Sequence, residues 1–333
     1  MYTFIVEKKD AKDQSVTGTY MGILRKACAL SGKVDTMAIG EKSCSKREYV
    51  ISDTIQTSFR YFMYGYRKQI VWMQGVVPEE SFMRRKSKLR FAVLSWMEKY
   101  VLKHSKMLLL VSEEMLRHYE KKYRLSLRQK SVIMPCFNET ELVETAFSPE
   151  KYKKNTYLYV GGMAKWQCFP EMAKLFKIIE EKDRDAVFYV YTFEREKAKA
   201  VLQECGVQHY QVDYAPKEVL SEKIQGIKYG FVLREDCAVN NVATPTKFSN
   251  YLANGIIPIY SDSLRDFAEV DAEYQIGVVC NIDDLEAGAE RVLAHGSQPV
   301  DSAVIKQKCQ SIFDSYYAQE RYIENIREKL NAL

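Results

Sequence analysis

The sequence lacks the features of a membrane-spanning or exported protein. None of its apolar runs approaches the ~18 residues that a transmembrane helix needs, and the densest run, 107–111, is far shorter. The first residues combine a short apolar core with mixed charges, whereas a signal peptide has a basic start and roughly 7–15 apolar residues. We therefore expect a cytoplasmic protein.

Cysteine pairs and histidine clusters are also missing. The eight cysteines include no CxxC pair, which indicates reduced core residues in a cytoplasmic chain. None of the four histidines has the spacing to another histidine or cysteine that a zinc site requires. The Asp-x-Asp sequence at 183–185 precedes a predicted strand, which is the wrong end for a metal–diphosphate site. We expect neither a metal nor a cofactor.

What is present is an ordinary globular composition with an uneven charge. The 333 residues are 47 % hydrophobic and 28 % charged, and this length suits two domains of roughly 100–200 residues each. Residues 1–150 hold 26 basic and 17 acidic side chains (+9), whereas the remainder holds 23 and 27 (−4). This asymmetry indicates two domains with different partners. A chance excess of solvated lysines explains it equally well.

Strand and helix patterns alternate along both halves. The predicted strands are 2–6, 34–39, 49–52, 70–74, 107–112, 131–134, 156–160, 186–191, 229–233, 256–260 and 276–279. The predicted helices are 18–30, 53–66, 86–103, 113–123, 169–181, 194–204, 247–253, 264–269, 283–293, 304–316 and 319–330. Such alternation favours parallel sheets with crossover helices. The polar, lysine-rich stretch 136–155 is predicted to link the two domains.

Two glycines follow the apolar strand pattern at 157–160. Gly161 and Gly162 would let the backbone approach a ligand, and the start of the next helix offers unpaired N–H groups to an anion. Lys165 adds a positive charge. The segment lacks the third glycine of a dinucleotide-binding fingerprint, and a plain strand–turn–helix corner also explains it.

A second motif lies between residues 229 and 262. A strand pattern ends at Arg234, and after a polar loop Thr244 and Pro245 predict a capped helix start. Lys247 then falls in the first turn, where the helix dipole disfavours a cation. Both features suit one bound anion, such as a diphosphate. The alternative is an unpaired surface lysine.

The strand pattern at 70–74 ends in a sequence with two carboxylates. Gln74 and Gly75 are followed by Glu79 and Glu80, and carboxylates beyond a strand end point toward the ligand edge of a parallel sheet. One of them could orient or deprotonate an acceptor hydroxyl. Capping of the next helix is an equally good explanation.

A basic run precedes an apolar helical pattern in the first half. Its cations are Arg84, Arg85, Lys86, Lys88 and Arg90. Leu89, Val93, Trp96 and Tyr100 follow at helical spacing, which predicts a helix that buries this face. An anionic membrane surface would attract the cations by about 1 kcal/mol each, and a lipid-linked diphosphate would do the same. A solvated charge run is the alternative. Nucleic acid fits less well, because the aromatic residues fall on the face expected to be buried.

Three stretches resemble a known family. TPTKFSNYLANGIIPIYSD, at 244–262, resembles the nucleotide-sugar site of GT-B glycosyltransferases, especially retaining family four and its relatives. VGGMAKWQ, at 160–167, resembles the loop that holds the donor diphosphate. MLLLVSEEMLRHYEKKY and SVIMPCFNET resemble the strand–Ser–helix and pre-linker stretches. The resemblance covers most of residues 100–290.

The resemblance implies an α/β GT-B architecture, with two doubly wound Rossmann-like domains facing a cleft. Residues 1–145 would form the acceptor-side domain and 146–303 the nucleotide-sugar-binding domain, with helices in 304–333 packing back on the first. The implied activity is metal-independent transfer of a hexose from a nucleotide sugar to a lipid-linked glycan in surface polysaccharide biosynthesis. The resemblance also implies a peripheral position on the inner face of the membrane.

The resemblance also implies residue roles. The expected catalytic residues are Lys247, Lys165 and Glu79. The expected donor-binding residues are Gly161, Gly162, Trp166, Arg234, Asn241, Thr244, Pro245, Phe248, Asn250 and Tyr251. The expected acceptor-side residues are Gly18, Thr19, Gln74 and Glu80. A simple helix start explains Gly18 and Thr19 equally well.

The sequence departs from the family pattern in two places. The paired glutamates of the family correspond to Val242 and Asn250, and its arginine after the first glycine corresponds to Gly162. Two other functions therefore stay open. One is an inverting transferase or epimerase that uses Glu79 or Glu80 as its base. The other is an inactive GT-B-like protein that binds a nucleotide or glycan as a partner subunit.

Overall fold

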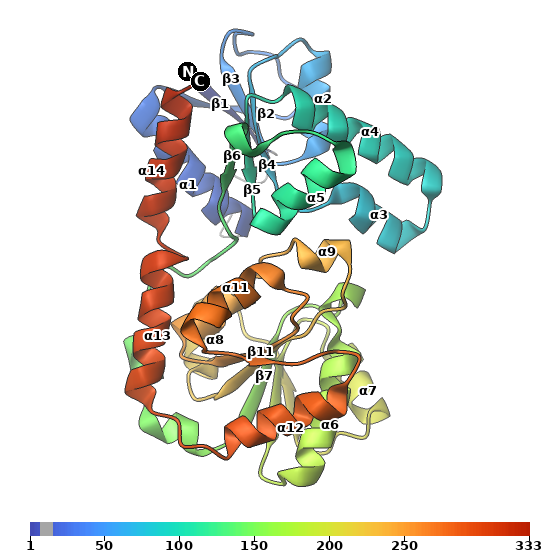
Figure 1. Cartoon of the computed structure of the whole chain (residues 1–333), viewed down its shortest axis with the longest axis vertical. Coiled ribbons are helices and arrows are strands. Elements are labelled where there is room, and N and C mark those ends of the chain that lie inside the picture. The colour runs from blue at the N-terminus through green and yellow to red at the C-terminus, as the bar shows by residue number, and fades with distance from the viewer. Residues whose placement is uncertain (7–15) are drawn as a thin grey trace. The chain divides into compact units, whose positions relative to one another are not determined.

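The computed structural model describes residues 1–6 and 16–333, which form two compact units (Figure 1). Unit 1 comprises Met1–Asn138, Asn241–Thr244 and Ala318–Leu333, and unit 2 comprises Glu139–Asn240 and Pro245–Tyr317. No helix in the described part of the chain combines the length and the apolar character needed to cross a bilayer.

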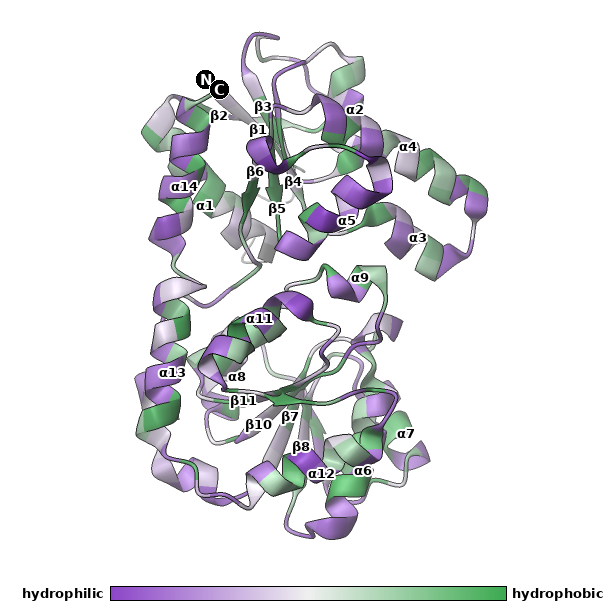
Figure 2. Ribbon diagram, in the orientation of Figure 1, coloured by the Kyte–Doolittle hydropathy of each residue, from purple (hydrophilic) through white to green (hydrophobic). Residues whose placement is uncertain are grey.

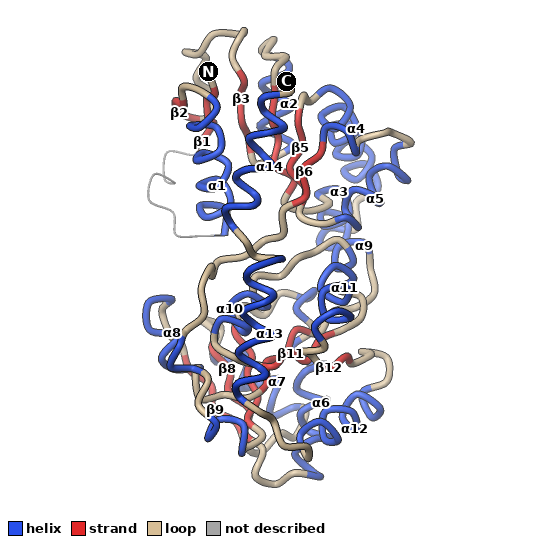
Figure 3. Tube along the Cα trace, turned by 60° about the vertical axis from the view of Figure 1, so that its left-hand side comes forward, coloured by secondary structure: helices blue, strands red, loops and turns tan. Residues whose placement is uncertain are grey.

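Unit 1 is built on a six-stranded parallel sheet of order β2-β1-β3-β4-β5-β6. Its strands are β1 (Tyr2–Val6), β2 (Val34–Ala38), β3 (Tyr49–Ser52), β4 (Gln69–Met73), β5 (Met107–Leu110) and β6 (Ser131–Ile133). Its helices are α1 (Val16–Ser31), α2 (Ile55–Met63), α3 (Val77–Arg85), α4 (Lys88–His104), α5 (Glu113–Tyr123) and α14 (Gln319–Asn331). Helices α1 and α14 lie on one face, and α2, α4 and α5 on the other (Figures 1 and 3).

Unit 2 repeats this plan with the order β12-β11-β10-β7-β8-β9. Its strands are β7 (Thr156–Val160), β8 (Val187–Tyr191), β9 (Tyr210–Asp213), β10 (Tyr229–Val232), β11 (Ile257–Tyr260) and β12 (Val278–Val279). Its helices are α6 (Phe169–Lys182), α7 (Arg195–Glu204), α8 (Lys217–Ile224), α9 (Ala238–Asn241, which ends at the border with unit 1), α10 (Lys247–Ala253), α11 (Arg265–Tyr274), α12 (Leu285–Gly296) and α13 (Ser302–Ser315). The predicted α/β class with parallel sheets is confirmed.

Each sheet reverses its strand order once. In unit 2, β7 is followed outward by β8 and β9 on one side, while β10 lies against its other edge and leads to β11 and β12. In unit 1 the reversal falls between β1 and β3. Because crossover connections are right-handed, the loops after the two strands at a reversal part to opposite faces and leave a crevice at the carboxyl edge.

The elements missed by the sequence analysis carry weak local signals. β9 lies at the edge of its sheet, and none of its residues is fully buried, so it lacks the continuous apolar run of a central strand. Helices α3 and α8 are short, with nine and eight residues. Most of the stretch 136–155, which the sequence analysis predicts as a linker, belongs to unit 2, which begins at Glu139. Val143 N donates to Ala253 O at 2.8 Å, and Tyr152 Oη donates to Gly255 O at 2.8 Å.

Helix α4 corrects the prediction that Leu89, Val93 and Trp96 are buried. Their exposed fractions are 77 %, 50 % and 60 %, and Tyr100 is only partly buried. The opposite face carries a fully buried carboxylate, Glu98.

Three hydrogen bonds from α5 hold the Glu98 carboxylate in place. It accepts from Tyr123 Oη at 2.6 Å, Lys122 Nζ at 3.2 Å and Tyr119 Oη at 3.5 Å. Burial raises the pKa of Glu98 to about 7, although Lys122 opposes the rise. These bonds turn the Glu98 face of α4 inward, which leaves the apolar stripe outside.

Glu98→Gln tests this arrangement. The raised pKa means that ionised Glu98 destabilises the fold above about pH 7, and that this cost fades as the pH falls toward 4.5. We expect the variant to be more stable than the wild type at alkaline pH by on the order of 1–3 kcal/mol, and the difference to shrink toward pH 5. Thermal unfolding across this pH range measures it. The exposed Glu204→Gln is the control, and parallel pH profiles for all three proteins would contradict the expectation.

Candidate functional site

The strand reversal of unit 2 brings together three of the residues expected at a donor site. Gly161 follows β7, Arg234 lies two residues beyond β10, and Lys247 begins α10. Because β7 and β10 are neighbouring parallel strands, their carboxyl ends meet at one edge of the sheet. Gly161 has φ +149°, and a Cβ atom there would lie 3.1 Å from both Nζ and Cε of Lys247. Only glycine combines this backbone conformation with the close approach of Lys247.

Arg234 is almost fully buried, with 3 % of its surface exposed. Its Nη2 donates to Gln167 Oε1 at 2.7 Å, and its Nη1 donates to the carbonyl oxygens of Gln167 at 3.2 Å and Leu233 at 2.8 Å. Its own backbone is fixed by Ser261 and Ser263, through bonds of 2.9 and 3.0 Å. The guanidinium is therefore held in one orientation before any ligand arrives.

Lys247 donates to the same oxygen. Its Nζ lies 2.7 Å from Gln167 Oε1 and 5.3 Å from the ring centroid of Tyr159, in a cation–π contact. The Tyr159 hydroxyl donates to Gly162 O at 2.6 Å, which fixes the turn after Gly161. The sequence analysis did not single out Gln167. It is the last residue of the segment that resembles the diphosphate loop, and a neutral side chain gives no charge signal there.

Within residues 1–6 and 16–333, the Arg234–Lys247 pair has no negative counterpart. Among the described residues neither side chain forms an ion pair, and the one oxygen that they share is neutral. Burial lowers the pKa of Lys247 well below 10.5, and the nearby Arg234 lowers it further. Burial also lowers the pKa of Arg234. Enclosed charges are costly without a partner, so an anion beside this pair would be stabilised.

The other expected donor residues of unit 2 differ in their access to this edge. Lys165 is exposed and lines a neighbouring pocket of about 210 Å³, and Trp166 is half-buried in the same turn. Phe248 and Tyr251 have exposed fractions of 1 % and 0 %. They support the strand ends from the interior, since the Phe248 ring stacks on Phe267 at 3.6 Å and the Tyr251 hydroxyl accepts from Val160 N at 3.3 Å.

The predicted cap at Thr244 and first turn at Pro245 are wrong, although the predicted range 247–253 coincides with α10. Helix α10 begins at Lys247 after Thr246, whose backbone is already helical, with φ −62° and ψ −11°. The Thr244 hydroxyl instead accepts from Cys136 N at 2.9 Å, and Asn241–Thr244 belongs to unit 1. Asn241 and Thr244 are therefore not in the same compact unit as Lys247.

Asn250, one of the two positions that lack the family glutamate, lies on α10 in unit 2. Its amide hydrogen-bonds Glu139, and its Oδ1 is buried with no hydrogen-bond partner. Burial raises the pKa of Glu139, while Lys217 and the bond from Asn250 oppose the rise. Asn250 therefore presents a neutral amide oxygen at this position.

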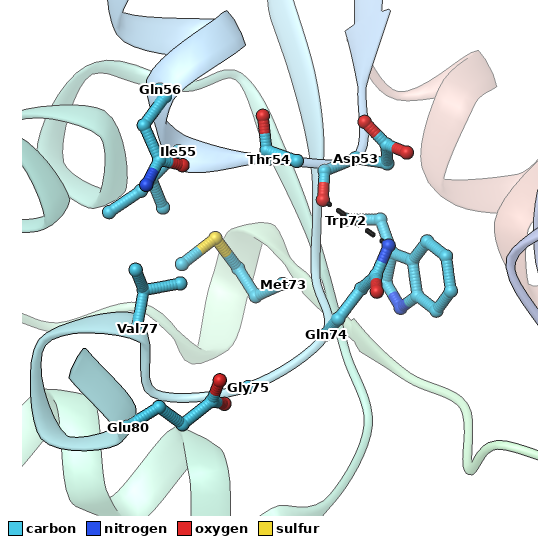
Figure 4. A pocket seen from close by; sticks show the side chains of 10 residues that line it. All are labelled: Asp53, Thr54, Ile55, Gln56, Trp72, Met73, Gln74, Gly75, Val77 and Glu80. Atoms are coloured by element: carbon cyan, nitrogen blue, oxygen red, sulfur yellow. Dashed lines mark hydrogen bonds between the residues drawn. The ribbon is translucent and has the colours of Figure 1, made fainter. Parts of the chain in front are cut away.

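Unit 1 holds a pocket of about 340 Å³ at the carboxyl ends of β3 and β4 (Figure 4). Its lining residues are Asp53, Thr54, Ile55, Gln56, Trp72, Met73, Gln74, Gly75, Val77 and Glu80. Gln74, an expected acceptor-side residue, donates through Nε2 to Asp53 O at 3.4 Å and thereby joins the two strand ends. The β3 end adjoins the strand reversal of this sheet.

The two neighbouring glutamates have different environments. Glu80 faces the pocket, and its Oε1 lies so close to Gly75 that a Cβ atom on residue 75 would collide with it. Burial raises the pKa of Glu80, although Arg84 opposes the rise.

Glu79, the expected catalytic carboxylate, does not line this pocket. Its Oε1 lies 3.2 Å from His118 Nε2 and 2.7 Å from Lys122 Nζ. Burial alone would raise the pKa of Glu79, but the hydrogen bonds from His118 and Lys122 outweigh it and hold the pKa below the ordinary value. Glu79 therefore ties α3 to α5, and of the two glutamates Glu80 is the one that lines the pocket.

Gly18 and Thr19 lie within the first turn of α1, as the alternative of a simple helix start predicts. The helix starts two residues before Gly18 because Val16–Ser31 has a continuous helical pattern that buries Tyr20, Ile23 and Leu24. Residues 7–15, which precede the helix, lie outside the described part of the chain.

Comparison with solved structures shows the fold. The chain aligns over 98 % of its length with 99 % of WaaG, a glycosyltransferase involved in lipopolysaccharide biosynthesis (TM-score 0.68, 14 % identity). It aligns over 99 % of its length with 98 % of sucrose-phosphate synthase from Thermosynechococcus elongatus (TM-score 0.72, 11 % identity). A variant of S. aureus TarM, solved with fondaparinux, alpha-GlcNAc-glycerol and UDP, gives a TM-score of 0.64 at 11 % identity over 86 % of this chain.

This chain spans 56 % of that TarM structure. No protein-family model matches the sequence, and no curated protein matches it. The predicted GT-B fold is confirmed, because these structures are GT-B glycosyltransferases.

Gly161→Ala tests the packing of the Arg234–Lys247 site. The methyl group would demand an unfavourable backbone conformation and would press on Lys247 Nζ and the Tyr159 hydroxyl. We expect a loss of about 1–3 kcal/mol in the free energy of unfolding, measured by denaturant titration. Gly226→Ala is the matched control, because a Cβ there has no atom within 4 Å, and we expect a change within about 0.5 kcal/mol. Equal effects of the two substitutions would contradict the strained, close-packed geometry of Gly161.

Proposed function

We propose that the chain is a glycosyltransferase, which transfers a hexose from a nucleotide sugar to a glycan acceptor. One observation carries this proposal: the Arg234–Lys247 pair lies at the strand reversal of unit 2 and shares a single neutral oxygen, with no carboxylate partner among the described residues. The diphosphate of a nucleotide sugar supplies the missing negative charge.

The same pair suits the chemistry of glycosyl transfer. Breaking the bond between the sugar and the diphosphate places negative charge on the leaving phosphate, and cations fixed in advance stabilise that charge as it develops. Arg234 is held by its bonds to Gln167 and Leu233, and Gly161 lets the phosphate approach the backbone. Two cations do this work without a metal ion, so we propose a metal-independent reaction.

The acceptor is assigned to the pocket of unit 1. In this proposal Glu80 accepts a hydrogen bond from, or takes the proton of, the acceptor hydroxyl, and the raised pKa of its carboxyl group makes it a stronger base. Gln74 lies beside it on the pocket wall. Glu79 acts as a positioning residue, because its bonds to His118 and Lys122 fix the helix that carries Glu80.

The biological setting is proposed by analogy with the structural neighbours. WaaG is described as acting in lipopolysaccharide biosynthesis, and the TarM variant was solved with UDP and a glycan. For this chain we propose a lipid-linked saccharide acceptor, a role in surface polysaccharide biosynthesis and a position on the inner face of the membrane.

Nucleotide binding is the first test. We expect one nucleoside diphosphate among UDP, GDP, ADP and CDP to raise the melting temperature equally with magnesium and with EDTA. Lys247→Met should lower its affinity by about tenfold or more, since a charged hydrogen bond is worth roughly 1.5–3 kcal/mol. Lys182→Met, an exposed lysine at the far end of α6, should leave the affinity unchanged.

Turnover separates the enzyme from a binding protein. The matching nucleotide sugar, incubated with the wild-type protein and a panel of saccharide acceptors, should release nucleoside diphosphate, and Lys247→Met should abolish the release. Binding without release for any acceptor would contradict the proposal and favour an inactive nucleotide-binding protein. A strict need for magnesium would contradict the metal-independent reaction.

The depressed pKa of Lys247 predicts a pH dependence of binding. An anion binds the protonated amine, so the affinity for the nucleoside diphosphate should fall with rising pH, and the fall should begin well below pH 10.5. Lys247→Arg keeps its proton and should move this fall to higher pH. Calorimetric titrations above about pH 7.5, where the phosphates are fully ionised, measure it. Identical pH profiles for the two proteins would contradict the role of Lys247.

A further inference from the structure

Three apolar side chains on the outer surface of α4 are largely exposed to solvent. Leu89, Val93 and Trp96 form a stripe along one side of this helix, and their exposed fractions, 77 %, 50 % and 60 %, are large for apolar side chains. We call these three residues the α4 stripe. Figure 2 shows α3 and α4 as a hairpin with hydrophobic segments along α4.

A neighbouring helix extends the stripe. Phe59 of α2 contacts the Trp96 ring edge-on at a centroid distance of 5.1 Å. Met63 lies one turn further along α2, on the same side of that helix, and 56 % of its surface is exposed. The apolar surface therefore spans two helices, and it comprises more than one isolated exposed side chain.

The segment that carries this apolar surface is strongly basic. Residues 84–112 contain eight basic side chains: Arg84, Arg85, Lys86, Lys88, Arg90, Lys99, Lys103 and Lys106. The only acidic residue in this stretch is Glu98, which is fully buried on the opposite face of α4. Arg84 pairs with Glu80 and Arg90 with the Ser81 hydroxyl, whereas Arg85, Lys86 and Lys88 are exposed at the turn between α3 and α4.

We propose that this hairpin docks the protein on an anionic phospholipid bilayer. Leu89, Val93 and Trp96 enter the boundary between headgroups and acyl chains, and the cations of the α3–α4 turn contact the lipid phosphates. A helix that lies in the membrane surface has this combination of an apolar face with lysine and arginine beside it. Tryptophan is favoured at this depth, since its ring is apolar and its N–H is polar.

The positive charge of the segment that carries the α4 stripe favours one binding partner over the others. A second copy of this chain would bring two sets of cations face to face, which opposes a symmetric dimer. A nucleic acid would leave Leu89 and Val93 without apolar contacts. An anionic bilayer satisfies both the charge and the apolar surface.

Membrane docking at this hairpin extends the proposed function. It rests on that proposed function for the identity of the acceptor. Helix α3 begins at Val77 on the wall of the acceptor pocket and ends at Arg85, next to the basic turn. Its nine residues span about 13 Å. A lipid-linked saccharide held at the membrane surface would thus meet its pocket within one short helix of the docking surface.

Vesicle binding tests the proposal with the full-length protein. We expect sedimentation with phosphatidylglycerol-containing vesicles and about tenfold weaker binding to phosphatidylcholine alone. Leu89→Ser/Val93→Ser and Arg85→Gln/Lys86→Gln/Lys88→Gln should each weaken binding by about tenfold or more. The matched controls on α1, Leu30→Ser and Lys26→Gln, change one exposed residue each and should bind like the wild type.

Fluorescence reports insertion directly. Brominated acyl chains should quench the wild-type tryptophan emission on anionic vesicles. Trp96→Phe should remove most of the quenching, because Trp72 is buried and the third tryptophan, Trp166, is partly buried in unit 2. Absence of vesicle binding, or binding that survives Leu89→Ser/Val93→Ser without quenching, would overturn the proposal. A dimer of the wild type that Leu89→Ser/Val93→Ser dissociates would also overturn it.

Nucleotide binding, measured on the same preparations, keeps the two hypotheses apart. A wild-type protein that binds vesicles but no nucleoside diphosphate supports docking and overturns the proposed function. A protein that binds the nucleotide but no vesicle does the reverse.

Discussion

Arg234 and Lys247 converge on one amide oxygen in unit 2, and several neighbouring residues hold them there. Gln167 Oε1 accepts from both side chains at 2.7 Å. Gly161 leaves room for the lysine, and Tyr159 lies under it. Ser261 and Ser263, which follow β11, fix the backbone of Arg234. A neutral oxygen orients the two side chains without neutralising their charge, which is the feature on which the proposed binding of a diphosphate rests.

In unit 1, the hydrogen bonds of one buried carboxylate determine which side of α4 is exposed. Glu98 is satisfied by Tyr119, Lys122 and Tyr123 of α5, and this network sets the rotation of α4 about its axis. Tyr119 also donates to Gly75 O at 2.9 Å, in the loop that lines the pocket of unit 1. The same helix rotation that buries one acidic group therefore exposes the α4 stripe. Packing around the pocket and the apolar surface of the hairpin are two consequences of one network.

Local sequence patterns predict most of the elements. The expected ranges 2–6, 49–52, 113–123, 156–160 and 247–253 coincide with β1, β3, α5, β7 and α10. They succeed because short apolar runs specify buried parallel strands and because Ser112 caps α5, accepting from Met115 N at 3.0 Å. Part of the candidate site can be predicted from the sequence in the same way. Gly161, Arg234 and Lys247 carry local signals of charge, conformation or strand end. Gln167 carries none, since a neutral amide is equally common on any surface.

Local residue order was enough to show where most of the strands and helices lie and which glycines and cations follow the strand ends. The pairing of β10 with β7, two strands far apart in the chain, came from the assembled sheet alone, and it brought Arg234 to Gly161. The assembled fold likewise selected which face of α4 is buried. The apolar spacing of Leu89, Val93 and Trp96 is a local property, whereas the burial of Glu98 depends on three donors from another helix. Periodicity reports that a helix has two faces, and the partners available in the fold select the one that faces inward.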